Sequence, residues 1–165
     1  MNADYFRSVW DYCYWARDQL LAATEGMSEE EYAQPNGFVY GSIRGILAHA
    51  LWGEAMWLTR WKGEAPTMPG ESDPPTLAEL KKRWGEEEAK MRAFLAGLSD
   101  GDLAADVKLR RRDGTEASWP LWQLVAHVAN HTTQHRSEAA EALTLIGRSP
   151  GNLDMLFYFA EKNQG

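Results

Sequence analysis

The sequence is poor in cysteine, in positive charge and in long apolar runs. Cys13 is its single cysteine, so a scaffold stabilised by internal disulfides is excluded and a reducing, cytoplasmic location is expected. Acidic residues outnumber basic ones by 24 to 17, and the net charge of −7 disfavours nucleic acid as a partner. No run of about 18 apolar residues occurs, so we expect no membrane span. The first residues have no basic segment followed by an apolar one, so we expect no secretory signal.

Apolar residues are plentiful enough for one core. The chain has 165 residues, 44% of them hydrophobic, which predicts a single domain over residues 1–165. Eight tryptophans are many for this length. They indicate a bulky core, a binding pocket or an apolar partner surface.

Apolar residues at helical spacing predict four long helices. Their approximate ranges are 5–24, 42–62, 77–98 and 120–146, with Ser42 and Thr76 as the expected N-caps of the second and third. The second is apolar almost all round, so it is buried on most sides or contacts a partner on one of them. Four such segments predict an all-α fold, a four-helix bundle whose order of helix directions cannot be assumed from the connections.

The connecting segments carry their own signals. Ser28 and Glu31 form a capping-box pattern that opens a short helical turn. Residues 63–75 are rich in proline and glycine and predict a loop. Residues 103–118 predict a small irregular hairpin or a long loop around Asp113 and Gly114. The apolar tail 153–159 is expected to pack back on the bundle.

All four histidines fall in two of the predicted helices. His49 lies in the second, and His127, His131 and His135 recur every fourth residue in the last. Those three lie within about 80° of one another, on a stripe that apolar residues share and that we expect to face inward. Each buried imidazole left without a partner costs about 1–3 kcal/mol, and a bound metal ion is the simplest common partner.

Helix geometry limits which histidines share an ion. His127 and His135 are about 12 Å apart along the axis, so one ion cannot bind all three histidines of the last helix. The pair is either His127 and His131 or His131 and His135, with His49 completing a three-histidine set. The alternative is a set of separate core histidines without an ion.

Other polar residues are ambiguous. Glu54, on the predicted buried helix, either orients a metal-binding histidine from behind or lies at an edge and reaches water or an arginine. Cys13 is more typical of a small core residue than of a nucleophile. The basic cluster 110–112 is more typical of a solvated surface than of a phosphate site.

Four motifs resemble the DinB-like, or YfiT-like, family of metal-binding four-helix bundles. They are Tyr12-x-x-Trp15-Ala16, the stretch 41–49 ending at His49, the stretch 127–136 with its three histidines, and Gly147-Arg-x-Pro150-x-x-Leu-Asp154-x-x-x-Tyr158. The resemblance extends over nearly the whole chain.

The resemblance implies a fold, a site and a class of chemistry. It implies one divalent ion, nickel or zinc, bound by residues that match His49, His131 and His135, with His127 a neighbour one turn away. It implies an up-down-down-up bundle with a short helical tail, paired into a homodimer. Activities in the family include transfer or isomerisation with a low-molecular-weight thiol, and hydrolysis has been suggested.

The stretch 134–138 departs from the family pattern, which often ends His-His-Arg-Gly-Gln. Here the stretch 134–138 reads Gln-His-Arg-Ser-Glu. Glu138 adds a carboxylate as a fourth ligand or as a base for proton transfer at the ion. The leading hypothesis is therefore a metal-dependent transferase or hydrolase with a small-molecule substrate. The alternative is a non-catalytic metal-binding or stress-response interaction protein.

Overall fold

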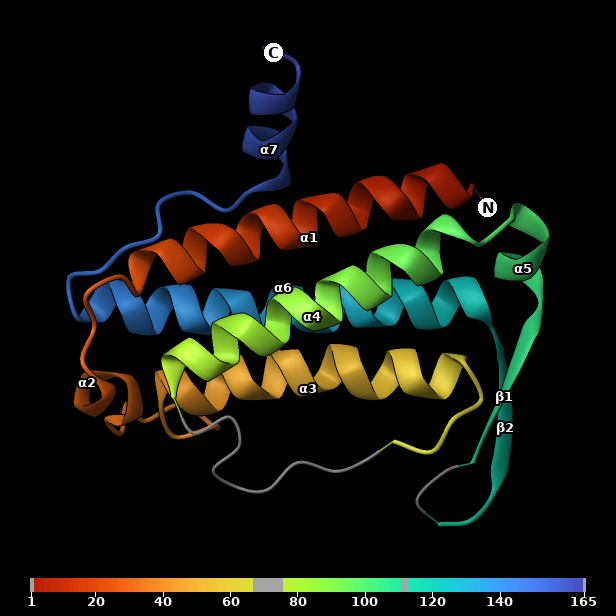
Figure 1. The fold of residues 1–165 in the computed structure, drawn as a ribbon, viewed down its shortest axis with the longest axis horizontal. Helices are drawn as coiled ribbons and strands as arrows, with labels where there is room; N and C mark the ends of the chain where they lie inside the picture. The colour runs from red at the N-terminus through yellow and green to blue at the C-terminus, as the bar shows by residue number, and fades with distance from the viewer. Residues whose placement is uncertain (1, 67–75, 111–112, 165) are drawn as a thin grey trace.

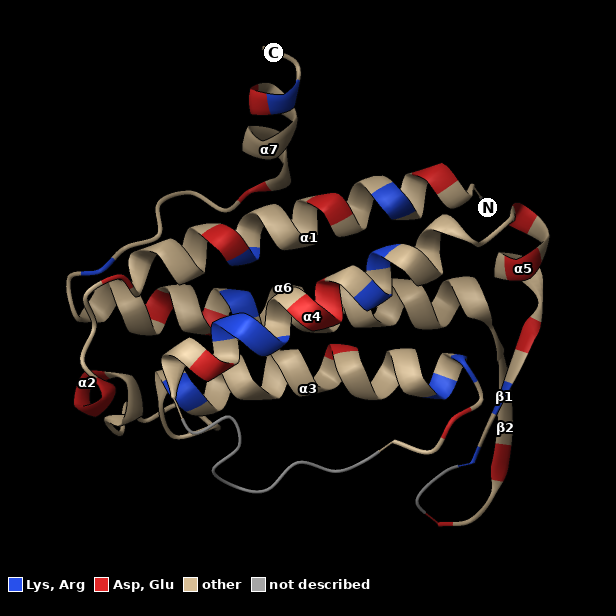
Figure 2. Ribbon diagram, in the orientation of Figure 1, with Lys and Arg blue, Asp and Glu red and all other residues tan. Residues whose placement is uncertain are grey.

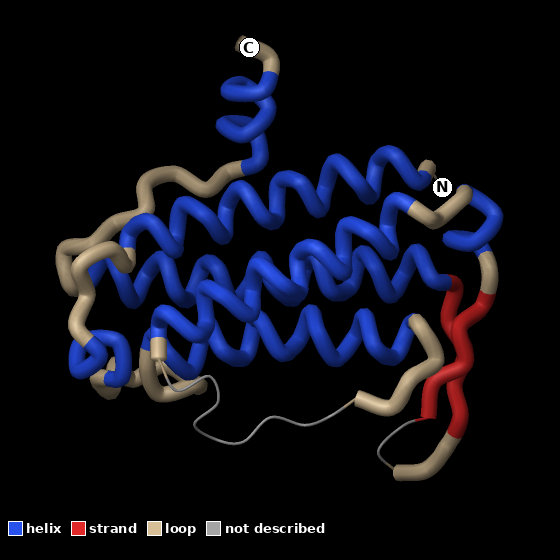
Figure 3. Tube along the Cα trace, viewed as in Figure 1, coloured by secondary structure: helices blue, strands red, loops and turns tan. Residues whose placement is uncertain are grey.

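The computed structural model describes residues 2–66, 76–110 and 113–164. Over these residues the chain is mainly helical, with one two-stranded antiparallel sheet at one end (Figure 3). The long helices are α1 (Ala3–Ala23), α3 (Ile43–Trp61), α4 (Leu77–Ala96) and α6 (Leu121–Leu145). The predicted all-α fold is confirmed.

In the described part of the chain, three shorter helices and two strands connect and extend the bundle. They are α2 (Glu29–Ala33), α5 (Asp100–Ala104), α7 (Met155–Lys162), β1 (Asp106–Arg110) and β2 (Glu116–Pro120). The predicted capping box of Ser28 and Glu31 opens α2. A second capping box, of Ser99 and Asp102, opens α5, a helix that the sequence analysis did not predict.

Side-chain caps fix where the long helices begin. The Ser42 hydroxyl accepts from the backbone N–H of Gly45, and the Thr76 hydroxyl accepts from that of Glu79. Each cap satisfies an N–H that has no partner within its helix. Both caps were predicted, and Ser42 caps the helix that carries His49.

The helices run in two directions. In Figure 1, α1 and α6 run from the right-hand end to the left, and α3 and α4 run the opposite way. Helix α6 packs against both α3 and α1, and α4 closes the bundle against the same two helices. The contact between α3 and α6 is the most extensive, and it brings the histidine-bearing helices together.

Apolar side chains fill the interior, while ion pairs cover the outer face of α4. Trp10 and Trp84 are among the largest fully buried side chains. Acidic and basic residues are interspersed along α4 (Figure 2), where Arg83 pairs with Glu79. None of the helices in the described part of the chain combines the length and hydropathy that a membrane crossing needs.

Two connections refine the sequence-based expectations. The segment after α5 forms a regular hairpin in which Asp106 pairs with Pro120 and Arg110 with Glu116. Pro120 closes β2 and precedes the first residue of α6, rather than lying within the helix. Residues 67–75 of the predicted loop and 111–112 of the basic cluster lie outside the described residues.

The tail packs back only in part. Tyr158 is buried, and its ring lies 6.1 Å from the ring of Tyr12 and 5.8 Å from that of Trp15. Leu156 is 71% exposed and Phe157 48% exposed. Figure 1 shows α7 standing away from the bundle. An eight-residue helix that contacts α1 through one face leaves its other apolar side chains uncovered.

Candidate metal centre

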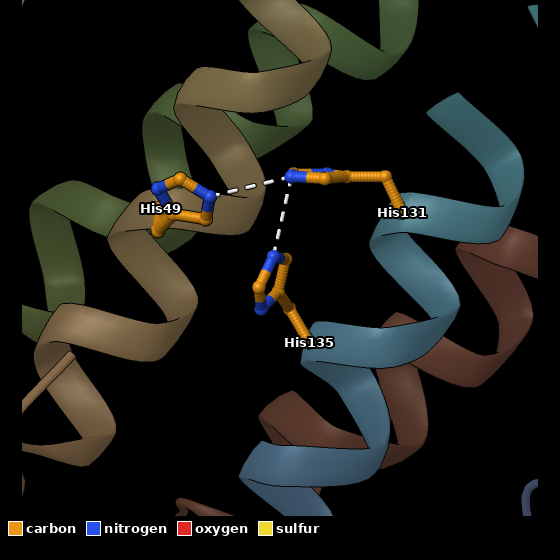
Figure 4. A group of neighbouring side chains, drawn as sticks. All are labelled: His49, His131 and His135. Carbon is orange, nitrogen blue, oxygen red and sulfur yellow. Dashed lines mark hydrogen bonds between the residues drawn. The ribbon is translucent and has the colours of Figure 1, made fainter. Parts of the chain in front are cut away.

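Three imidazole rings meet between α3 and α6. His49 comes from α3, and His131 and His135 come from successive turns of α6 (Figure 4). The Nε2 atom of His131 lies 3.3 Å from Nε2 of His49 and 3.2 Å from Nε2 of His135. One nitrogen from each ring lies within 4.8 Å of the others. The structure therefore brings together a set that can bind one ion.

A glycine makes room for the central ring. Gly53 follows His49 by one turn on α3, and a Cβ atom there would lie 2.9 Å from Cε1 of His131 and 3.2 Å from its Nδ1. Real Cβ contacts are longer, because carbon atoms in contact are about 3.5–4.0 Å apart. The missing side chain thus lets the His131 ring approach α3 and reach His49.

The rings are held in the form that binds metals. Burial, with the nearby His135, lowers the pKa of His49, and burial with the other three histidines lowers that of His131 to about 4. At neutral pH these two imidazoles are therefore uncharged, with a lone pair to donate. The buried Nδ1 atom of His131 has no hydrogen-bond partner among the described residues.

These observations fit a single divalent cation. Two neutral imidazoles share one hydrogen at most, so three Nε2 atoms that converge cannot satisfy one another fully. A cation accepts all three lone pairs at once. Three histidines are a known ligand set for zinc, and imidazole also suits nickel.

Glu138 contacts a histidine from behind. Its Oε2 atom accepts from Nδ1 of His135 at 2.8 Å, and its Oε1 atom accepts from Nε2 of Gln134 at 3.2 Å. Burial raises the pKa of Glu138, but the hydrogen bonds from His135 and Gln134 and the nearby His49 together leave the pKa below its usual value. A carboxylate on Nδ1 fixes the tautomer whose Nε2 lone pair is free for a metal. In this arrangement Glu138 is a positioning residue for His135.

Tyr40, which was not predicted as a site residue, lies against His49. Its ring stacks on that of His49, with centroids 4.0 Å apart, and its hydroxyl lies 2.9 Å from Nε2 of His49. Burial, with the nearby Glu138, raises the pKa of Tyr40. Tyr40 lies two residues before the cap of α3, and its position beside that predicted cap was the one available signal.

His127 lies at the edge of the site. It is exposed, its ring meets Trp57 edge-on at 5.3 Å between centroids, and 6.1 Å separates it from the ring of His131. The expectation that all three histidines of α6 face inward is wrong for this residue. Each step of four residues turns a side chain by about 40°, so His127 is rotated from His135 by about 80°.

Glu54 lies in the bundle interior. It is 2% exposed, and its carboxylate accepts from Nε1 of Trp84 at 3.1 Å. Burial raises its pKa to about 7, although Trp84 and the charges of Arg136 and Arg17 oppose the rise. Within the described residues its carboxylate is hydrogen-bonded to Trp84 and to no histidine, so the structure does not bring Glu54 to the candidate ligands. Cys13 is also buried in the core, as expected.

A cavity opens beside the histidines. Its volume is about 620 Å³, and His49 and His131 form part of its wall with Trp52, Met56 and Trp57. These tryptophans thus line a pocket beside the site, whereas Trp10 and Trp84 belong to the core. A small molecule in this cavity can reach two of the three candidate ligands.

Comparison with known proteins gives one family. The model described as "DinB family" matches residues 1–164. A relative named Protein DinB, from Bacillus subtilis strain 168, is 24% identical over 174 aligned positions, which cover 98% of this chain and 98% of the relative. The match includes both histidine-bearing helices.

Proposed function

The chain belongs to the DinB family, and we propose that it is a divalent-metal-dependent enzyme whose nickel or zinc ion is bound by His49, His131 and His135. One observation carries the proposal: the three Nε2 atoms converge beside a cavity of about 620 Å³, whose wall includes His49 and His131. A centre beside such a space is reachable by a substrate, which a purely structural ion does not require.

The proposed chemistry is transfer or isomerisation with a low-molecular-weight thiol, or hydrolysis. When bound by three protein ligands, a divalent ion keeps an open position and activates a water or thiol there as a nucleophile. The chain's own residues hold this arrangement. Glu138 fixes the His135 ring through Nδ1, and Gly53 admits the His131 ring. Trp52 and Trp57 limit the water in the cavity and offer apolar surface to a substrate.

A non-catalytic role is the second candidate. The three histidines connect α3 to α6, the most extensive helix contact in the bundle, so an ion there would also stabilise the fold. The coordination distinguishes the two functions. An ion closed by protein atoms favours a structural or sensing role, and an ion with an exchangeable water favours catalysis.

We also propose that the protein is a cytoplasmic homodimer. Leu156 and Phe157 on α7, with Leu145 and Ile146 at the end of α6, are exposed apolar side chains, which supports a contact with a second copy. Analytical ultracentrifugation tests it. We expect the wild type to sediment with twice the chain mass and Leu156→Glu to sediment as a monomer. A monomeric wild type would refute the homodimer.

The deciding experiment is elemental analysis of the purified, untagged protein. We expect about one nickel or zinc ion per chain in the wild type and none in the His131→Ala variant. His127→Ala is the matched control, because it removes an exposed histidine from the same helix one turn away. Absence of metal after reconstitution, or equal loss in both variants, would refute the site. A metal-loaded protein then justifies screening thiol transfer and hydrolysis.

A further inference from the structure

Tyr40 covers the His49 side of the candidate centre. Its ring is stacked on His49 with 20° between the planes and meets the His135 ring edge-on at 5.1 Å between centroids. Its hydroxyl lies 2.9 Å from Nε2 of His49. In the tautomer that can bind a metal, Nε2 carries no hydrogen, so the hydroxyl is the donor of this bond.

The backbone holds Tyr40 in this place. Its carbonyl accepts from the N–H of Ser42 at 2.9 Å, and a Cβ atom on Gly45 would lie only 1.9 Å from that carbonyl oxygen. Gly41 between them has a φ of +75°, a conformation that favours glycine. The junction between the loop and α3 thus depends on two glycines, and it presents the half-buried Tyr40 ring to the histidines.

The hydrogen bond from Tyr40 and a bond to a metal need the same lone pair. An imidazole Nε2 atom has one lone pair, so His49 cannot bind an ion and accept from the hydroxyl together. With an ion bound, the hydroxyl stays beside the centre because stacking holds its ring, but it has lost its acceptor. A half-buried donor without an acceptor is unfavourable.

We propose that the Tyr40 hydroxyl donates a hydrogen bond to the small molecule that enters the open position of the metal centre. This inference rests on the proposed function. The expected ligand binds the ion through an atom that keeps a further lone pair for the hydroxyl. A thiolate sulfur and the terminal nitrogen of azide are such atoms. A ligand such as imidazole, whose binding nitrogen keeps no lone pair, gains nothing from Tyr40.

The test uses the full-length protein loaded with Co²⁺, whose visible spectrum reports its ligands. Azide is the anionic probe and free imidazole the neutral one, and each is titrated into the wild type, Tyr40→Phe and Tyr32→Phe. The Tyr40→Phe change removes one oxygen and keeps the stacked ring. Tyr32→Phe is the matched control, because Tyr32 is a fully buried tyrosine whose hydroxyl has no hydrogen-bond partner among the described residues.

We expect Tyr40→Phe to weaken azide binding about tenfold, or about 1.4 kcal/mol, without weakening the binding of imidazole or Co²⁺. Tyr32→Phe should change none of the three. Unchanged azide binding in Tyr40→Phe would overturn the inference, as would a loss of Co²⁺ as large as in His49→Ala, which would make Tyr40 itself a ligand. A wild-type protein that binds no Co²⁺ would refute the proposed function and this inference together.

Discussion

Replacing Gly53 by alanine is expected to weaken the metal centre without touching any ligand. The new Cβ atom would lie 2.9 Å from Cε1 of His131, whereas carbon atoms in contact are about 3.5–4.0 Å apart. The His131 ring must therefore move by about 0.6–1 Å. Metal–nitrogen bonds are about 2.0–2.1 Å long, and functional geometry is held within about 0.5 Å. We expect zinc affinity to fall by about 10–100-fold, as when a group that orients a ligand is lost.

Unlike its zinc affinity, the folding stability of the metal-free Gly53→Ala variant should not fall. Alanine favours a helix interior over glycine by about 1 kcal/mol, so the metal-free Gly53→Ala protein should be about as stable as the wild type, or more so where the ring yields. Gly85→Ala is the matched control, since a Cβ atom there has no atom within 4 Å. It should gain the same helix propensity and keep full zinc affinity.

Competition with a chromophoric chelator gives the zinc affinity, and urea unfolding of the metal-free proteins gives the stability. We expect the two variants to differ in zinc affinity and not in fold. If Gly53→Ala bound zinc as tightly as Gly85→Ala, the approach of His131 to α3 would be irrelevant to the ion, and the assignment of this ring as a ligand would be refuted.

Three further predictions concern charge and pH. Glu138→Gln should weaken zinc binding about 10–100-fold in the same competition assay. The control Glu141→Gln, at an exposed position on the same helix, should not weaken it. Equal zinc affinities of the two variants would contradict the positioning role of Glu138. The folded-state pKa of Glu54 is raised to about 7 from 4.5, so its contribution to folding stability is full below the unfolded pKa and is lost as pH rises through 7. In urea unfolding, Glu54→Gln should therefore be more stable than the wild type by about 3 kcal/mol at pH 8 and not at pH 4.5. A variant that is less stable at both pH values would show that the core needs the charge. The pKa of His131 is lowered to about 4 from 6.5, so the metal-free protein should lose the contribution of the neutral His131 to folding stability as pH falls from 6.5 to 4. If the free energy of unfolding of a His131→Gln variant had the same pH dependence as that of the wild type, this prediction would be contradicted.

The long helices were readable from the sequence because their signals are local. Apolar spacing and the caps Ser42 and Thr76 depend on residues within one or two turns, and the structure reproduces them. The same holds for the capping box that opens α2. The orientation of α7 was not readable, because it depends on which of its apolar faces meets α1, and that is a tertiary contact.

The candidate site was readable only in part. Spacing showed that His131 had a partner one turn away but left His127 and His135 equivalent, and the family resemblance favoured His135. The structure explains the difference by rotation along α6, which turns His127 outward. Tyr40 and Gly53 were missed because their roles depend on tertiary contacts. Tyr40 reaches His49 from the loop before α3, and Gly53, having no side chain, lets the His131 ring of α6 approach α3.

Glu54 and Glu138 show why residue type alone could not assign roles near the site. Both are carboxylates on the helices that face each other there, and both were candidates for a role near the ion. Glu138 receives a hydrogen bond from His135, so its charge is retained and directed at a candidate ligand. Glu54 faces Trp84 in the interior, where burial favours the neutral acid. Different measurements therefore distinguish the two residues. A change at Glu138 should alter metal affinity with little effect on folding stability. A change at Glu54 should alter the pH dependence of folding stability with little effect on metal affinity.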